Sequence, residues 1–168
     1  SGVYQPDAGQ IRLAGEPELP PSMLPDQAPT GPLRLTVLVP AHDEALTIAA
    51  TLRSLWGQTR PPDQVIVVAD NCTDDTADIA RNHGAEVFTT VANEEKKAGG
   101  LNQVLAEMFP DIDARDVAMI MDADSIIVPA FLETAMGRLE ADPDLMAVGG
   151  VFYGEEGGGL VRQLQRNE

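Results

Sequence analysis

Short apolar runs alternate along the chain with segments in which apolar residues recur at helical spacing. From Leu33 onward, such runs predict five strands, over residues 35–39, 65–69, 86–90, 117–121 and 146–152. Some of them are continuous, such as Val65 to Val68, which is typical of strands that are covered on both faces.

The intervening segments predict four helices. The first has one apolar face, made of Ile48, Ala49, Leu52, Leu55 and Trp56. The second is predicted over residues 74–82, with Thr73 or Asp74 as its N-cap and Gly84 after its end. The last two are predicted over residues 101–108 and 129–140, the latter with Pro129 at its first position.

Regular alternation of strands and helices predicts an α/β fold with right-handed crossovers and a mainly parallel sheet. In such sheets, ligands bind beyond the carboxyl ends of the strands. The polar clusters of this sequence follow the predicted strands directly, so we expect any site to lie at that edge.

The first 32 residues differ from the rest in composition, because they hold seven of the 13 prolines and show no apolar periodicity. Proline lacks an amide donor and restricts the residue before it, so we expect residues 1–32 to form an extended linker or a disordered arm. Residues 33–168 are expected to form one globular domain.

Charge narrows the range of partners. The formal net charge is -16, from 27 acidic and 11 basic residues, which disfavours nucleic acid. A phosphate-bearing ligand would need a metal ion, backbone N–H groups or a few well-placed cations. A single cysteine, Cys72, and the lack of an apolar run of about 20 residues favour a cytoplasmic location, at the cytoplasmic face of a membrane in a longer protein.

Three polar clusters each have a structural and a functional interpretation. Pro40-Ala41-His42-Asp43-Glu44 fits a turn into a helix, or backbone groups and a ring that contact a planar base. Asp70 fits a helix cap, or an acceptor for the donors of a base or ribose. Lys97 fits a solvated charge run, or a cation that binds a diphosphate. In the second interpretation, the small residues Gly99 and Gly100 beside it let the diphosphate approach closely. These glycines match neither a Walker loop nor a dinucleotide fingerprint.

The fourth cluster is Asp122-Ala123-Asp124, directly after an apolar strand. In extended backbone, side chains at i and i+2 point to the same side, so the two carboxylates can share one cation. Carboxylate oxygens suit Mg²⁺ or Mn²⁺, which often bridge to substrate phosphates. The structural alternative is a polar turn before the next helix.

Taken in order, the four motifs at residues 39–44, 67–76, 97–102 and 121–124 resemble the family 2 glycosyltransferases. The match covers roughly residues 33–151. The resemblance implies a GT-A fold, a Rossmann-like α/β sandwich, and inverting transfer from a nucleoside diphosphate sugar, with UDP favoured by the resemblance alone.

The resemblance also implies which residues bind the donor: Pro40, Ala41, His42, Glu44, Asp70, Lys97 and Asp122. The His42 ring and the backbone before it would contact uracil, and Asp70 would accept from the base. Lys97 would approach the diphosphate. Asp122 would lie near the ribose or in the metal shell, and Asp124 would bind Mg²⁺ or Mn²⁺.

The catalytic base and the acceptor are not identified. In the family the base is an acidic residue farther downstream, so we expect it beyond Glu168; Glu155 and Glu156 are weak candidates. The segment with Leu160, Val161 and Leu164 predicts a helix that continues past the end. We therefore expect a fragment, resembling the donor half of a membrane-associated polysaccharide synthase, with an unknown saccharide or lipid-linked acceptor.

Three alternatives stay open at this point. A haloacid dehalogenase-like phosphatase would use Asp122 as nucleophile and Asp124 as acid, but Ile126 stands where it needs Thr or Val. A sugar nucleotidyltransferase would need a Gly-rich loop where His42 lies. A catalytically silent domain that binds nucleotide sugars or acts as a scaffold would keep the same donor motifs.

Overall fold

A computed structural model describes residues 31–150 of the chain. In this part, four strands form one parallel sheet, as the alternation predicted. They are β1 (Arg34–Ala41), β2 (Gln64–Ala69), β3 (Glu86–Thr89) and β4 (Asp116–Ile120). Their order across the sheet is β3-β2-β1-β4, so β1 lies inside the sheet, paired on both sides.

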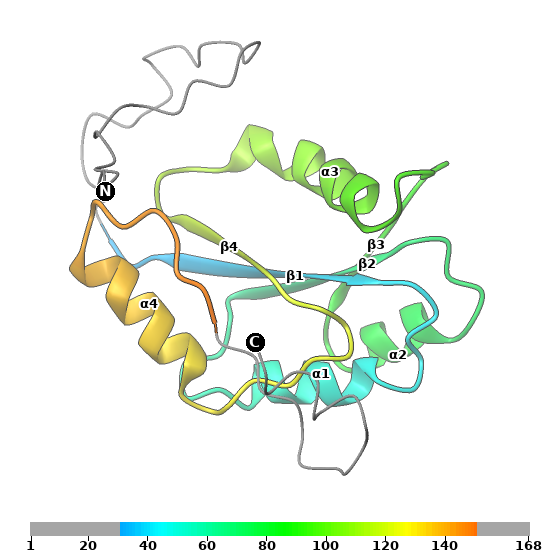
Figure 1. The fold of residues 1–168 in the computed structure, drawn as a ribbon, viewed down its shortest axis with the longest axis horizontal. Coiled ribbons are helices and arrows are strands. Elements are labelled where there is room, and N and C mark those ends of the chain that lie inside the picture. Colours follow the sequence, from blue (N-terminus) through cyan, green and yellow to red (C-terminus); the bar gives the residue numbers. More distant parts are fainter. Residues whose placement is uncertain (1–30, 151–168) are drawn as a thin grey trace, which may run out of the picture.

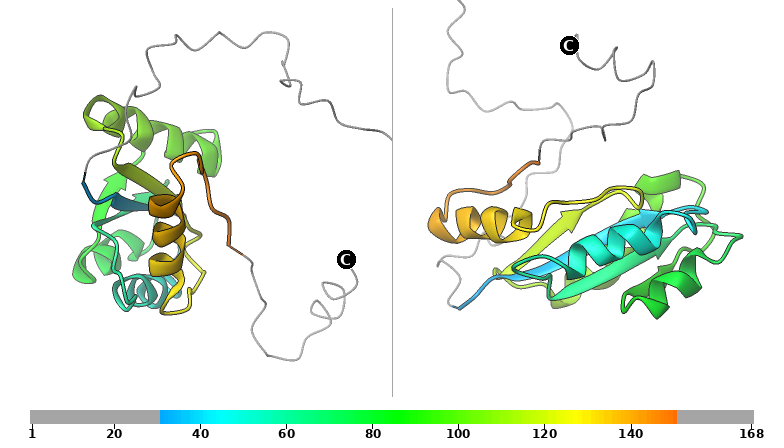
Figure 2. Two further views of the ribbon diagram at one scale, coloured as in Figure 1. Left: turned by 90° about the vertical axis from the view of Figure 1, so that its left-hand side faces the viewer. Right: turned by 90° about the horizontal axis from the view of Figure 1, so that it is seen from below.

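Helices cover the two faces of the sheet unequally. They are α1 (Ile48–Trp56), α2 (Thr76–Asn82), α3 (Lys96–Met108), which runs into a short 3-10 turn η2 (Phe109–Asp111), and α4 (Phe131–Ala141). In Figure 1, α3 lies on one side of the sheet and α1, α2 and α4 lie on the other, and Figure 2 shows the same arrangement from two further directions. The described part is thus a three-layer α/β/α structure.

Side-chain alternation along β1 produces two separate cores. Val37 and Val39 are fully buried in the larger core, against α1, α2 and α4. Leu38 points the other way, into a smaller core with Ile66 and Val104 beneath α3. Because both faces of β1 are covered, its apolar residues pack the centre of the fold.

Helix α1 also holds the segment that follows β4. The hydroxyl of Thr51 donates to the carbonyl of Ala123 at 2.7 Å. The buried amide of Gln58 donates to the carbonyl of Val128 at 2.9 Å and accepts from the N–H of Leu132 at 3.1 Å. These bonds fix the chain between the carboxyl end of β4 and α4.

The prediction of a strand over residues 146–152 is wrong for residues 146–150, which the structure describes. Residues 146–150 form no strand, and Met146 is 84% exposed. A strand needs a hydrogen-bonding neighbour, and these residues pair with none of the four described strands. Residues 151 and 152 lie outside the described part.

Three predicted helix starts are shifted. Helix α3 begins at Lys96 instead of residue 101, and it includes Gly99 and Gly100, which are buried in its first turns. Helix α2 begins at Thr76, although the Asp74 carboxylate accepts from the Thr76 N–H at 3.0 Å, as a cap would. Helix α4 begins at Phe131, two residues after Pro129.

The predictions for residues 1–30 and 151–168 lie outside the described part. They concern the N-terminal arm, the candidate bases Glu155 and Glu156, and the last predicted helix with Leu160, Val161 and Leu164. Among the described helices, none has the length and apolar character needed to cross a lipid bilayer.

Candidate functional site

A pocket of about 590 Å³ lies at the carboxyl ends of the strands. It is lined by residues from the end of β1, from the loops after β1, β2, β3 and β4, and from the start of α3, which meet at one end of the sheet in Figure 1. All eight residues predicted for the donor and metal line it: Pro40, Ala41, His42, Glu44, Asp70, Lys97, Asp122 and Asp124. The structure therefore brings the predicted residues together, and their roles stay predictions.

Asp122 and Asp124 lie directly beyond the end of β4. Their neighbours Met121 and Ala123 are buried, at 4% and 3% exposure, whereas both aspartates are exposed. The alternation expected from an extended chain is present, but the backbone already turns, because the N–H of Ser125 donates to the carbonyl of Asp122 at 3.1 Å. Both carboxylates line the pocket and offer oxygen ligands suited to a hard divalent cation.

Lys97 lies in the first turn of α3 and reaches across the pocket. Its ammonium group forms an ion pair with the Asp122 carboxylate, and both side chains are about half exposed. Lys96 lines the pocket beside it. The pocket thus places two cations and the positive end of a helix next to two carboxylates.

Asp70 is buried, with 8% exposure, at the end of β2. Its Oδ1 accepts three hydrogen bonds, from Thr90 Oγ1 at 2.7 Å, Asn93 Nδ2 at 2.8 Å and Asn71 Nδ2 at 3.2 Å. It does not cap α2, which begins six residues later. The capping interpretation of Asp70 is therefore wrong.

His42 and Glu44 both line the pocket. The His42 Nδ1 donates to the carbonyl of Asp70 at 2.6 Å, and this bond, helped by the nearby charges of Asp43, Asp70 and Asp74, raises the pKa of His42 above 6.5. The ring itself is exposed. The Glu44 carboxylate accepts from the hydroxyl of Thr47 at 2.7 Å.

Left-handed backbone gathers around this pocket. In residues 31–150, four residues other than glycine have a positive φ: Asp43, Asn71, Ala92 and Lys96. Asp43, Asn71 and Ala92 lie in the loops after β1, β2 and β3, and Lys96 is the first residue of α3; Asn71 and Lys96 line the pocket. Such conformations cost energy, and proteins keep them most often where a loop must be held in one shape.

A second group of possible metal ligands lies nearby, where Asp43, Cys72 and Asp74 offer atoms within 4.8 Å of one another. Each of the three side chains already makes a hydrogen bond within the protein. Asp43 accepts from the Thr73 N–H, which lowers its pKa, and burial raises the pKa of the Cys72 thiol, which favours the protonated form. We interpret this group as a brace between the loops after β1 and β2.

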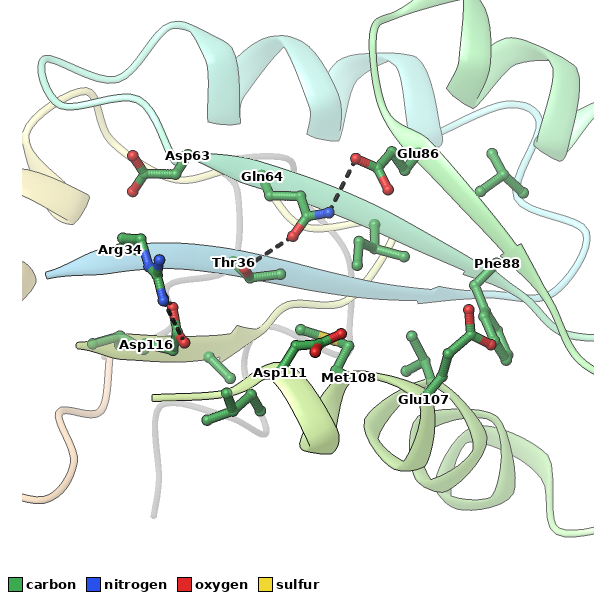
Figure 3. A pocket seen from close by; sticks show the side chains of 16 residues that line it. Arg34, Thr36, Asp63, Gln64, Glu86, Phe88, Glu107, Met108, Asp111 and Asp116 are labelled. Carbon is green, nitrogen blue, oxygen red and sulfur yellow. Dashed lines mark hydrogen bonds and ion pairs between the residues drawn. The ribbon is translucent and has the colours of Figure 1, made fainter. Parts of the chain in front are cut away.

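A larger cavity, of about 790 Å³, lies at the opposite ends of the strands, on the part of the sheet that α3 leaves open. Figure 3 shows Arg34 directed toward Asp116, and Gln64 between Thr36 and Glu86. Arg34 pairs with Asp116 at 2.8 Å, and Gln64 links Thr36 to Glu86. This cavity is the larger of the two, but several of its polar groups pair with each other, and none of the predicted site residues lines it.

Sequence reasoning missed five residues that line the smaller pocket: Asn71, Asn93, Glu94, Lys96 and Ala123. Asn93 matters most, because it contacts Asp70 across 23 positions of the chain. The only local signal was a polar residue soon after a predicted strand.

Comparison with known proteins identifies the family. Residues 36–167 match the model of the family described as glycosyl transferase family 2. The chain is 31% identical over 130 residues to the cellulose synthase 1 catalytic subunit [UDP-forming] of Komagataeibacter xylinus, covering 76% of this chain and 16% of that protein. It is 41% identical over 90 residues to 4,4'-diaponeurosporenoate glycosyltransferase of Staphylococcus aureus, covering 54% of this chain and 24% of that protein.

Solved structures match in fold. S. aureus TarS superposes with a TM-score of 0.55 at 24% identity, over 65% of this chain and 20% of that one. Glucosyl-3-phosphoglycerate synthase of Mycobacterium tuberculosis, in a complex with Mn²⁺, UDP and phosphoglyceric acid, superposes with a TM-score of 0.52 at 26% identity, over 64% of this chain and 39% of that one. The described sheet and helices are therefore those of a GT-A fold.

The chain spans a quarter or less of the length of the two curated relatives named above. Even so, the family model covers most of it, and the phosphatase and nucleotidyltransferase alternatives are thereby overturned. From the fold, the four motifs and the matched model, the chain belongs to glycosyltransferase family 2.

Proposed function

We propose that this chain binds a nucleoside diphosphate sugar, a UDP-sugar, together with Mg²⁺ or Mn²⁺, and transfers the sugar with inversion to a saccharide or lipid-linked acceptor. One observation carries the proposal: eight residues from four separate segments line a single pocket at the carboxyl ends of the strands. The complex of the M. tuberculosis relative with Mn²⁺ and UDP supports the choice of ligands.

The pocket has a polar group for each part of such a donor. Asp70 and the exposed His42 ring are suited to accept from a uracil and to stack on it. Lys97, Lys96 and the first turn of α3 suit a diphosphate. Asp122 and Asp124 would hold the cation.

Departure of the diphosphate is the step that these residues would assist. Negative charge builds on the leaving diphosphate during transfer, and a bound divalent cation would neutralise part of it. Lys97 would donate to the same oxygens, which requires it to exchange its contact with Asp122 for one with the donor. The general base that inversion requires is expected in the acceptor-binding part of the enzyme.

Thermal melting with nucleoside diphosphates tests the proposal. With Mn²⁺ present, UDP at a hundred times its Kd should stabilise the fold by about 2.7 kcal/mol. That corresponds to a rise in melting temperature of roughly 5 to 10 °C for a domain of this size. Asp124→Ala should abolish the Mn²⁺-dependent part of the rise.

Glu107→Ala is the matched control, because it removes an exposed carboxylate from α3 that lies outside the pocket. It should leave the UDP shift unchanged. If wild-type protein shows no shift with UDP and Mn²⁺, the donor-binding proposal fails. If UDP binds but a longer protein that includes the acceptor-binding part neither transfers nor hydrolyses the sugar, the silent binding domain is the better description.

A further inference from the structure

We propose that Thr90 and Asn93 are positioning residues that hold the Asp70 carboxylate in the orientation needed to receive the nucleobase. The inference rests on the proposed function, since it assumes that Asp70 meets the base. It adds two residues from the segment after β3 to a part of the site that the four sequence motifs do not cover.

The hydrogen bonds on Asp70 are unevenly distributed between its two oxygens. Oδ1 accepts from Thr90, Asn93 and Asn71, and Oδ2 accepts from no described residue. No buried side-chain oxygen in the described part lacks a partner, so Oδ2 is accessible. The carboxylate is thus fixed by one oxygen and presents the other to the pocket that it lines.

Thr90 and Asn93 are themselves well held. Thr90 is 8% exposed, as Asp70 is, and its N–H donates to the carbonyl of Ala69 at 3.1 Å. Asn93 uses its second amide hydrogen to donate to the carbonyl of Lys96 at 2.7 Å, and its Oδ1 accepts from the N–H of Glu95 at 3.1 Å. Asn93 therefore joins Asp70 to the start of α3, which carries Lys97.

The two glycines of α3 make room for this arrangement. A Cβ built on Gly99 would overlap Asn93 Oδ1, and one on Gly100 would lie 3.2 Å from the methyl group of Thr90. Both glycines are buried, and neither lines the pocket. Close packing against Thr90 and Asn93 accounts for glycine at both positions.

A structural role alone would also explain these bonds, since a buried carboxylate needs donors. The two roles differ in which part of the donor they affect. A residue that orients Asp70 acts on the base alone, and its loss should weaken UDP while leaving pyrophosphate unaffected. A residue that merely stabilises the pocket should affect both ligands or neither.

The experiment compares Thr90→Val with Thr90→Ser by calorimetric titration of the whole chain with UDP and with pyrophosphate, both in Mn²⁺. Valine keeps the shape of threonine and removes the hydroxyl, whereas serine keeps the hydroxyl. We expect Thr90→Val to weaken UDP about tenfold, the size of one hydrogen bond to a charged group. Thr90→Ser should bind UDP within about twofold of wild type, and pyrophosphate should bind all three proteins equally.

Asn93→Ala provides a second test on a half-buried loop residue if Thr90→Val fails to fold. It should also weaken UDP about tenfold. Pyrophosphate is compared for Thr90→Val alone, because Asn93 also donates to the carbonyl of Lys96 at the start of α3. Equal UDP affinity in folded Thr90→Val or Asn93→Ala and in wild type would overturn the positioning role, as would an equal loss for pyrophosphate in Thr90→Val. If wild-type protein binds neither ligand, the proposed function itself fails.

Discussion

The hydrogen bond from His42 to the carbonyl of Asp70 links the loops after β1 and β2 through one imidazole. Because the donor Nδ1 and the surrounding aspartates favour the charged ring, the pKa of His42 is raised above 6.5. A raised pKa in the folded state means that protonation stabilises the fold. The contribution is full below 6.5 and is lost as the pH rises through the raised value.

We therefore expect His42→Gln to destabilise the protein more at pH 5.5 than at pH 9. Urea unfolding of wild type and variant at both pH values measures the difference. An NMR titration gives the pKa directly, with His83→Gln to identify the signal of the second histidine. A destabilisation that is the same at both pH values would show that His42 acts by shape alone.

At the scale of single residues, the sequence predicted those site residues whose positions depend on neighbours close in the chain. Asp122 and Asp124 follow from period-two alternation at the end of a strand, and the buried neighbours on either side of Asp122 agree with it. Asn93 could not be predicted in this way. Its partner Asp70 is 23 positions away, and no short-range pattern encodes that contact.

Among the elements, α1 has two roles. It packs in the core, and it fixes the turn that carries the two aspartates. Thr51 is 1% exposed, and its hydroxyl donates to Ala123, which lies between Asp122 and Asp124. The predicted face of α1 contained only its apolar residues. The pattern of apolar residues cannot predict the burial of Thr51, because its partner is a backbone carbonyl 72 positions away.

Thr51→Val should lower the free energy of unfolding by about 1 to 3 kcal/mol, because it leaves a buried carbonyl without a donor. Thr134→Val in α4 is the matched control, since the Thr134 hydroxyl also donates to a carbonyl, that of Ala130 at 2.8 Å, but is exposed. It should change stability by less than about 0.5 kcal/mol. Urea unfolding measures both. Equal effects would mean that the bond to Ala123 does not hold the turn.

The positions of the four described strands were predictable because continuous apolar runs are short and bounded by polar residues, whereas the fifth predicted strand was wrong over residues 146–150. Helix starts were less predictable. The start of α3 was placed five residues late, because Gly99 and Gly100 weaken an isolated helix, and only their tertiary contacts with Thr90 and Asn93 show why they are there. Tertiary packing overrode local propensity at that point.

Across the whole molecule, the net charge of -16 is the dominant electrostatic feature. Self-repulsion at that charge destabilises a compact fold, and salt screens it over about 10 Å at 0.1 M ionic strength. The exposed ion pairs, such as Arg81 with Asp78, act in the opposite direction but contribute little. Repulsion should therefore prevail.

We expect the melting temperature to rise when NaCl is increased from about 10 mM to about 150 mM. Glu107→Gln, which removes one exposed negative charge, should raise the melting temperature at low salt and have a smaller effect at high salt. Differential scanning calorimetry measures both trends. A melting temperature that falls with added salt would show that the ion pairs outweigh the repulsion.

The pairing of β1 with both β2 and β4 determines when the pocket can be completed during synthesis. Strand β4 comes last of the four in the chain, yet it joins the first, and the bond from Arg34 to Asp116 spans 82 positions. On a ribosome, the segments with His42, Asp70 and Lys97 emerge before the two aspartates. The pocket is complete only when β4 docks, so under the proposed function, affinity for UDP with Mn²⁺ would report that the last of these long-range contacts has formed.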